Sequence, residues 1–391
     1  MSLSPAVWRA ALALALAAAV ALGAARFSYA LLLPPMRADL GWSYFFAGAM
    51  NTVNASGYLL GALWLPSLLR RFDARAVMLW GGFGCALLLM LHGAVRDDAA
   101  LLVLRLASGV CSAASFVAGG VLAARLAGQA GVRGGQVLGL YYGGVGLGIV
   151  LSALVVPPLV ATGVAGWSLG WVALGGLSLL AGLGTALGTR SLVAPPLAGA
   201  AREPLRLRDF GWGLAGYGMF GLGYIGYMTF IVTLLREQGM SSAGITAFYA
   251  LLGLGVVASS WLWAGLLQRH RDGWPLALLN ALLALATLLP VLSSHPLAVF
   301  VSGALFGSVF LSVVASTTAL VRHNASPAAW PVGIAAFTIA FAAGQIVGPS
   351  LTGAIADGAG GLQRGLAISA GVLALGAVLA RWQRALPRPG A

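Results

Sequence analysis

The chain has 391 residues, of which 60% are hydrophobic and only 8% are charged. Soluble globular proteins carry about 25% charged residues because their surface faces water. The composition therefore excludes a soluble enzyme, a secreted disulfide scaffold and a disordered regulator, and it indicates a polytopic helical membrane protein. The formal net charge of +13 comes entirely from Arg, since the sequence has no Lys, and no basic run is interleaved with aromatic residues as nucleic-acid binding requires.

Apolar stretches of 19 or more residues recur along the chain between short polar segments. Each stretch is long enough to cross a hydrocarbon core about 30 Å thick, so the pattern predicts an all-α integral membrane protein with twelve transmembrane helices. The expected spans are 9–33, 44–68, 76–95, 100–124, 136–161, 167–189, 210–234, 243–267, 275–293, 297–321, 330–355 and 362–382. Residues 10–25 also resemble a signal peptide, but the apolar run continues to Leu33, which favours an uncleaved first helix.

The positions of the arginines predict the orientation of the chain. With the N-terminus inside, sixteen arginines fall on the cytoplasmic side and only four on the outer side, while Arg26 and Arg105 lie within spans. Positively charged loops stay in the cytoplasm, so we expect both termini there. The predicted location is a bacterial inner (plasma) membrane, crossed many times by one chain.

The sequence also divides into two similar parts. The longest polar connection, at 190–208, is rich in Pro and Arg and separates six spans from six. It predicts an N-terminal six-helix bundle at 1–189, a cytoplasmic linker at 190–208 and a C-terminal six-helix bundle at 209–391. A shift of about 198 residues pairs Gly23 with Gly221, Tyr29 with Tyr227, Gly41 with Gly239 and Gly109 with Gly307. Transporters built from two parallel six-span halves bind their substrate near the bilayer midplane, where the halves meet.

Several segments resemble one family of transporters. Residues 26–29 (Arg-Phe-Ser-Tyr) and 33–36 (Leu-Pro-Pro-Met) are similar to the first helix of the YbfB/YjiJ-type branch of the major facilitator superfamily. Residues 220–230 and 344–357 resemble its seventh and eleventh helices, and 105–109 matches the superfamily's fourth-helix Arg-x-x-x-Gly motif. The resemblance covers nearly the whole chain. It implies a monomeric secondary transporter that works by rocker-switch alternating access.

Gating and coupling residues are expected at the ends of the spans. The loop at 70–75 resembles a degraded form of the superfamily's gating motif, in which Arg70 and Asp73 replace the usual acid and glycine. All nine acidic residues lie in loops or at span ends, so a coupled proton would use Asp39, Asp357 or a carboxylate of the substrate itself. Uniport and anion exchange stay open. The candidate gating and coupling residues are Arg70, Arg71, Arg75, Arg269, Asp39 and Asp357.

Only two charges lie well inside the predicted spans, and they lie at similar depth. A charged side chain in the bilayer costs several kcal/mol, so Arg26 and Arg105 indicate a functional site. The first and fourth helices of the superfamily both line its central cavity, so the resemblance implies that the two arginines face each other. Arg binds carboxylate or phosphate through two parallel hydrogen bonds, which predicts a small organic anion as substrate. The alternative is that Arg26 snorkels outward or bonds to helix carbonyls.

Polar side chains in apolar spans complete the predicted site. The substrate-binding candidates are Arg26, Tyr29, Asn51, Asn54, Arg105, Tyr141, Tyr142, Tyr224, Tyr227 and Gln345. The pair Arg26 and Tyr29 is expected to face Tyr224 and Tyr227 across the pseudo-twofold axis. Hydrogen bonds between helices are the alternative role for the Asn and Tyr residues. We expect His92, near the outer end of its span, to be interfacial.

Other functions remain open or are excluded by particular residues. A multidrug or hydrophobic-compound efflux transporter is the main alternative, since the cavity would be aromatic and sparsely charged; sugars, amino acids and nucleosides are further substrates. A P-loop requires Lys, so an ATP-driven pump is excluded on this chain. A membrane enzyme requires a nucleophile–base pair or a metal cluster at depth, which the sequence does not offer. We predict no cofactor and no metal. The expected partners are a small-molecule substrate, H⁺ or a counter-anion, and membrane lipid.

Overall fold

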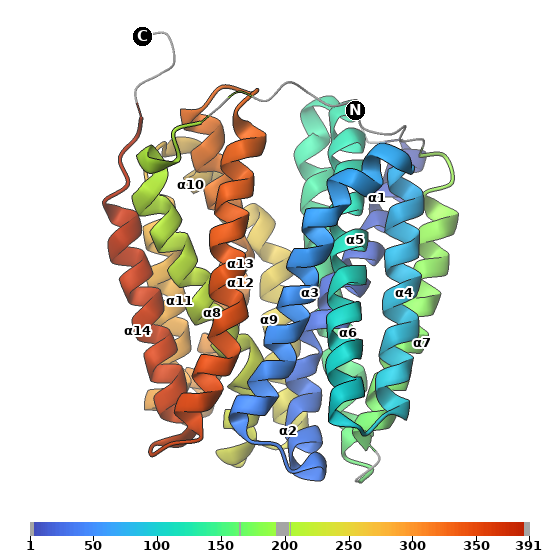
Figure 1. Cartoon of the computed structure of the whole chain (residues 1–391), viewed down its shortest axis with the longest axis vertical. Coiled ribbons are helices and arrows are strands. Elements are labelled where there is room, and N and C mark those ends of the chain that lie inside the picture. Colours follow the sequence, from blue (N-terminus) through green and yellow to red (C-terminus); the bar gives the residue numbers. More distant parts are fainter. Residues whose placement is uncertain (1–3, 164–165, 193–202, 204, 387–391) are drawn as a thin grey trace. The chain divides into compact units, whose positions relative to one another are not determined.

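The computed structural model describes residues 4–163, 166–192, 203 and 205–386. In that part of the chain the regular elements are all helical (Figure 1). The first six predicted spans correspond to α1 (Pro5–Ala18), η1 (Ala19–Phe27) and α2 (Tyr29–Leu40) together, then α3 (Tyr44–Arg71), α4 (Ala74–Ala94), α5 (Asp98–Gln129), α6 (Gly134–Val160) and α7 (Gly166–Gly188). The last six correspond to α8 (Gly211–Glu237), α9 (Ser242–Leu262) with α10 (Ala264–Arg269), α11 (Trp274–Leu292), α12 (Pro296–Asn324), α13 (Trp330–Ala356) and α14 (Gly361–Arg381). Short 3₁₀ turns, η2 (Gly131–Arg133) and η3 (Leu207–Phe210), precede α6 and α8.

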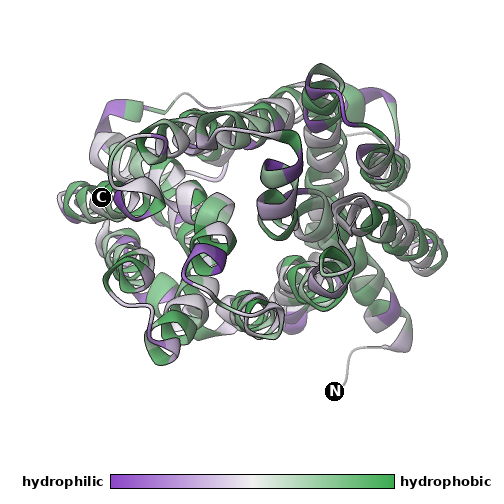
Figure 2. Ribbon diagram, turned by 90° about the horizontal axis from the view of Figure 1, so that it is seen from below, coloured by the Kyte–Doolittle hydropathy of each residue, from purple (hydrophilic) through white to green (hydrophobic). Residues whose placement is uncertain are grey.

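The helices have the length and composition of membrane spans. Eleven helices or helix runs in the described residues are long and apolar enough to cross a membrane. The exception is α3, whose 28 residues include Asn51, Thr52, Asn54 and Ser56, and these lower its mean hydropathy. Figure 2 shows that hydrophobic residues occupy most of the helical ribbon. Each of the twelve predicted spans therefore coincides with a helix.

The described residues group into two compact units. Unit 1 comprises Met1–Trp42, Val53–Ala198 and Leu235–Val257, and unit 2 comprises Ser43–Thr52, Gly199–Leu234 and Ala258–Ala391. The first nine residues of α3 thus group with unit 2, while most of α9 groups with unit 1. The division into bundles at 1–189 and 209–391 stays a prediction, and most of its linker lies outside the described residues.

The first span is interrupted by a π-helix. Between Ala19 and Phe27 the helix widens, and the Ser28 N–H donates to the Gly23 carbonyl five residues back, at 3.1 Å. The Ser28 hydroxyl donates to Ala24 O in the same turn. Short π-helical segments inside α-helices are frequent at functional sites. This one contains Arg26, and the sequence pattern, which predicts one continuous helix, did not reveal it.

Glycines hold the π-helix against α6. A Cβ on Gly148 would stand 2.3 Å from the Ala19 carbonyl oxygen, and a Cβ on Gly23 would stand 2.5 Å from the Gly148 Cα. Side chains cannot occupy such spaces, so only glycine permits this approach of the two backbones. A Cβ on Gly144 would likewise stand 2.1 Å from the Ala15 carbonyl oxygen, so α6 packs closely along the first span and fixes the backbone that carries Arg26.

Candidate functional site

The two arginines predicted to lie in the membrane are both enclosed within unit 1. Arg26 on η1 has 5% of its surface exposed and Arg105 on α5 has 1%. The alternative in which Arg26 snorkels outward is wrong, because the packed protein encloses the side chain. Both guanidinium groups are positively charged, and no Asp or Glu lies in the interior of the described spans. Unit 1 therefore holds two like charges in its interior.

Aromatic rings and a helix carbonyl surround the guanidinium groups. The Arg105 guanidinium carbon lies 4.6 Å from the centre of the Tyr29 ring, and its Nη1 donates to the Ala25 carbonyl at 3.3 Å. Arg26 lies over the Tyr58 ring instead, at 5.4 Å. A cation over an aromatic face is attracted by the ring quadrupole. Tyr29, expected beside Arg26, thus contacts Arg105, and Tyr58 is a site residue that sequence reasoning missed.

A contact between α3 and α5 fixes the position of Arg105. The Asn54 Nδ2 donates to the Arg105 carbonyl and to the Ser108 hydroxyl, each at 3.0 Å. Across the same contact, a Cβ on Gly109 would stand 2.2 Å from the Asn54 carbonyl oxygen. The Arg-x-x-x-Gly motif therefore places its glycine where α3 passes and its arginine one turn away, beside Ala25. Asn54 therefore holds the α5 backbone at Arg105.

Two further hydroxyl groups bond to carbonyls of the π-helix. The Tyr249 hydroxyl on α9 donates to Phe27 O at 2.6 Å, and the Ser112 hydroxyl on α5 donates to Ala21 O. A π-helix displaces backbone carbonyls from their usual i+4 partners, and side chains of neighbouring helices can take up the bonds. Sequence reasoning missed both residues. A polar side chain in an apolar span, the signal that selected Tyr29, was available for each.

His92 lies in the last turn of α4. The side chain is fully enclosed, with its ring 4.8 Å from the Trp171 ring and its Nδ1 2.7 Å from the Leu88 carbonyl. Because a carbonyl only accepts, Nδ1 carries a proton in this contact. Its interfacial depth at the end of the span stays a prediction, and its ring is turned toward Trp171 of α7.

The two neighbouring tyrosines of α6 have different surroundings. Tyr141 is 1% exposed, its hydroxyl donates to Phe116 O, and its ring stacks on the Phe116 ring at 5.5 Å. Tyr142 is 43% exposed. Tyr141 thus joins α6 to α5 through a hydrogen bond between helices. Such bonds are the alternative role that the sequence analysis gave to the Tyr residues. A substrate role for both tyrosines stays a prediction.

The candidates in unit 2 also bond to neighbouring helices. Tyr227 shares a 2.7 Å hydrogen bond with Ser302 and stacks on Phe306 with ring centres 4.0 Å apart. The Asn51 Nδ2 donates to the Thr229 hydroxyl at 2.7 Å. Asn51 and Asn54, three residues apart on α3, therefore bond to different units. Their substrate roles stay predictions.

An aromatic stack dominates the interior of unit 2. We define it as Tyr217, Phe220 and Tyr224 of α8 with Phe341 of α13. The ring centres lie 4.7–5.5 Å apart and the planes are inclined by 19–24°. The Tyr224 hydroxyl donates to the Gln345 Oε1 at 3.1 Å, which joins two predicted site residues. The i, i+3, i+7 spacing on α8 places its three rings on one helix face.

The two acidic coupling candidates bind groups at helix ends. Asp39 accepts from Arg96 at 2.6 Å and from the Trp167 indole at 2.8 Å, within unit 1. Asp357 in unit 2 accepts from the backbone N–H groups of Tyr44 and Phe45, at 2.7 and 2.8 Å. These N–H groups form the first turn of α3, where a carboxylate is favoured by the helix dipole. Both acids hold elements together at the end of the spans predicted to lie outside.

The basic gating candidates differ in their contacts. Arg75 donates to the Thr189 hydroxyl at 3.1 Å and to the Ala186 carbonyl at 2.8 Å, so it ties α4 to the end of α7. Arg70 bonds only to Ser67 of its own helix among the contacts described. Arg71 and Arg269 are exposed. Arg271, which the sequence analysis did not select, donates to the His323 carbonyl and thereby joins the start of α11 to α12.

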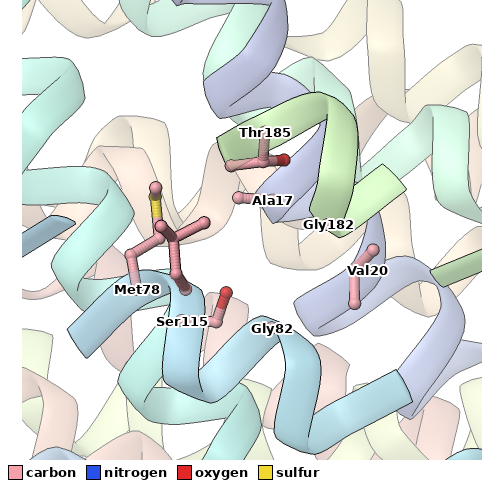
Figure 3. Close-up of a pocket in the computed structure, with 8 residues that line it drawn as sticks. Ala17, Val20, Met78, Gly82, Ser115, Gly182 and Thr185 are labelled. Carbon is pink, nitrogen blue, oxygen red and sulfur yellow. The ribbon is translucent and has the colours of Figure 1, made fainter. Parts of the chain in front are cut away.

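A small internal cavity lies apart from the arginines in unit 1. Figure 3 shows it between α1, η1, α4, α5 and α7, with the side chains of Val20, Met78, Ser115 and Thr185 at its wall. Its volume is about 10 Å³, close to the minimum that holds one water molecule. The cavity is too small for an organic solute. In the described residues, no group of three or more His, Cys, Asp or Glu side chains is arranged to hold a metal ion.

Comparison with known families gives one match. The model of a family described as "Uncharacterised MFS-type transporter YbfB" matches residues 18–381. No curated protein sequence matches the chain.

Solved structures with the same fold include transporters of different kinds. A bacterial homolog of the human lysosomal transporter Spinster, inward-facing and unoccupied, has a TM-score of 0.72 at 16% identity, over 97% of both chains. The nucleoside transporter NupG has a TM-score of 0.73 at 15% identity, over 96% of this chain and 98% of its own. The human organic anion transporter MFSD10 has a TM-score of 0.63 at 16% identity, over 96% of this chain and all of its own, 100%. At such identities the likeness concerns the fold.

Proposed function

The chain belongs to the family of uncharacterised MFS-type transporters named for YbfB, and we propose that it is a secondary transporter of a small organic anion. It is a multi-pass membrane transporter, and we propose that its activity is movement of a solute and not catalysis. We propose alternating access by rocking of two six-helix halves in a bacterial inner membrane, with both termini cytoplasmic. In this proposal the protein works as a monomer.

The observation that carries the proposal is the pair of enclosed arginines. Arg26 and Arg105 are 5% and 1% exposed, and they lie on helices that cross the membrane. No Asp or Glu lies in the interior of a span, so the pair gives this depth a net positive charge. An anion would relieve the repulsion between the two guanidinium groups. Arg is also the side chain best suited to a carboxylate, because its planar fork matches the two oxygens.

The rings beside the arginines support an organic rather than an inorganic anion. Tyr29 and Tyr58 each present a face to a guanidinium group. A carboxylate with an apolar or aromatic body would place its charge on the arginines and its body on such rings. We therefore infer a monocarboxylate-like solute as the substrate class.

A multidrug or hydrophobic-compound efflux transporter is the second candidate. The observation that favours it is the aromatic stack of unit 2, which fills the interior of that unit with apolar rings. The fold does not choose between the candidates, because similar structures include a nucleoside transporter and an organic anion transporter. The two candidates differ in whether the arginines bind substrate.

Gating is proposed at the helix ends. The Asp357 carboxylate, bonded to the first turn of α3, would act as a latch that opens when α3 moves from α13. Asp39 and Asp357 are the acids through which a proton would be coupled. Arg70, Arg71, Arg75 and Arg269 are proposed to act at the opposite ends of the spans.

The proposal is tested by ligand-induced thermal shifts and by uptake into proteoliposomes. We expect a panel of organic carboxylates to stabilise the purified protein, and neutral or cationic drugs to have no such effect. Arg26→Gln and Arg105→Gln should each weaken anion binding by about 30-fold or more, which corresponds to about 2 kcal/mol. Arg105→Lys keeps the charge but loses the fork, so we expect an intermediate loss.

The matched control is Arg364→Gln, which removes an exposed arginine from the N-terminal turn of α14. It should leave the anion-induced shift unchanged. Unchanged shifts for every anion in both Arg26→Gln and Arg105→Gln would overturn the proposed site. Stabilisation by hydrophobic drugs that is independent of both arginines would favour the efflux candidate.

A further inference from the structure

A hollow of about 510 Å³ lies at the arginine-rich end of unit 2. It forms where η3 leads into α8 and where the chain leaves α14. Asp209 and Trp212 line it from the first segment, and residues 381–384 and Leu386 line it from the second. None of these residues belongs to the transport or gating machinery proposed above.

The segment that follows α14 is fixed in place. Gln383 is 3% exposed, and its side chain donates to the Asp209 carbonyl and accepts from the Gly213 N–H, each at 3.0 Å. Three residues later, the Leu386 N–H donates to the Asn324 Oδ1 at 2.8 Å. Because the segment is held to both α8 and α12, the hollow is a formed part of the fold and not a gap beside a loose tail.

The lining combines cations with indole rings. Arg381 and Arg384 are exposed, and in the part of the chain that the structure describes neither guanidinium group has an ion pair or a hydrogen bond. The ring of Trp274 lies 5.8 Å from the Arg381 guanidinium carbon. Trp212 and Trp382 meet edge to face with ring centres 4.9 Å apart, and about half of each is exposed. Exposed tryptophans at the ends of membrane spans lie at the depth of the lipid headgroups.

We propose that this hollow binds the phosphate headgroup of an anionic phospholipid from the adjoining leaflet. Two guanidinium groups provide the hydrogen-bond donors and charge that a phosphodiester requires. Basic pockets between the ends of transmembrane helices bind such headgroups. Asp209 also lines the hollow, so the lining has a net charge of +1, and this carboxylate weakens the binding of an anion.

The experiment is native mass spectrometry of the delipidated full chain with phosphatidylglycerol or phosphatidylcholine added. We expect one phosphatidylglycerol to bind at least about 5-fold more tightly than phosphatidylcholine. The double variant Arg381→Gln, Arg384→Gln should lose about 10-fold or more in phosphatidylglycerol affinity. Asp209→Asn should gain about 5-fold, because it removes the repelling carboxylate and keeps the backbone carbonyl that binds Gln383.

The control is the double variant Arg206→Gln, Arg208→Gln. It removes the same charge from exposed arginines just before the hollow that do not line it. We expect less than about a 2-fold change. An equal loss in both double variants would overturn the site, since it would indicate diffuse attraction to a basic surface. Asp209→Asn keeps the test valid if the arginine variant fails to fold, and no gain in that variant would also overturn the site.

A second arm separates a lipid from a free phosphate. Phosphatidylglycerol that stays bound in excess inorganic phosphate supports the lipid. Displacement of the lipid by inorganic phosphate alone would overturn the lipid assignment.

Discussion

The two units enclose different chemistry at matching positions. Under the 198-residue shift, Arg26 corresponds to Tyr224 and Tyr29 corresponds to Tyr227. At the first of these paired positions unit 1 has the cation Arg26, whereas unit 2 has Tyr224, a ring of the aromatic stack. The charged side chains that are buried in the described residues, Arg26 and Arg105, both lie in unit 1.

We propose that this difference separates two tasks of recognition, one in each unit. Buried cations repel one another and are stable only with nearby carbonyls, rings or an anion, so unit 1 is proposed to carry the electrostatic recognition. Stacked rings are stabilised by their own packing, so unit 2 has a rigid apolar interior at this position. Variants that act on one unit and spare the other show whether the division holds.

The largest expected effect is on the packing of unit 2. Phe220 is fully buried and stacks on three rings of the aromatic stack, so Phe220→Ala should lower the free energy of unfolding by about 3 kcal/mol. Chemical unfolding in detergent measures the loss. The control Ile339→Ala, at an exposed position of α13, should cost under about 0.5 kcal/mol. If Phe220→Ala lowers the free energy of carboxylate binding by more than it lowers the free energy of unfolding, Phe220 recognises the anion. That result would contradict the division of tasks between the two units.

The second effect tests the positioning of Arg105 in unit 1. Asn54→Ala removes the bonds to the Arg105 carbonyl and to Ser108 and should cost about 2 kcal/mol of stability. We also expect weaker binding of carboxylates at an unchanged affinity for neutral aromatic compounds. Anion titrations of the variant and of Asn54→Asp distinguish positioning from charge. If the variant loses stability but binds anions as the wild type does, Asn54 is structural only.

The third effect compares the ends of the two units. Asp357→Asn should cost about 1–2 kcal/mol, because an amide oxygen satisfies the first turn of α3 less well than a carboxylate. Asp39→Asn should cost about 1 kcal/mol, and only this loss should shrink with added salt, since Arg96 is largely exposed. Unfolding at low and high ionic strength measures both. If the stability losses of the two variants depend equally on salt, the ends of the two units do not differ in their electrostatics.

The smallest effect separates the ring of Tyr224 from its hydroxyl. Tyr224→Phe keeps the stack and loses the bond to Gln345, so we expect a cost below about 1 kcal/mol. Carboxylate-induced thermal shifts should not change. A lost shift would place the anion against the hydroxyl and would merge the tasks of the two units.

Much of the fold followed from the sequence, and particular residues show why. Spans are long apolar runs, and a run such as 330–355 can only be one helix, here Trp330–Ala356. For Arg26 and Arg105 a place within a span favoured enclosure by protein, but it left outward snorkelling open, which only the structure decided. The partners were less predictable. Tyr29 contacts Arg105, and the α3 residues Asn51 and Asn54 bond to different units.

What the sequence determined by itself was the membrane environment, the helices, the family and the excess of positive charge at depth. Each of these depends on composition or on local runs, which are written along the chain. The tertiary structure decided the π-helix around Arg26, the enclosure of His92 and the hydrogen bond from the Tyr249 hydroxyl to the Phe27 carbonyl. The physical reason is that each of these features depends on a contact with a neighbouring helix. The local sequence does not encode which helix will be that neighbour.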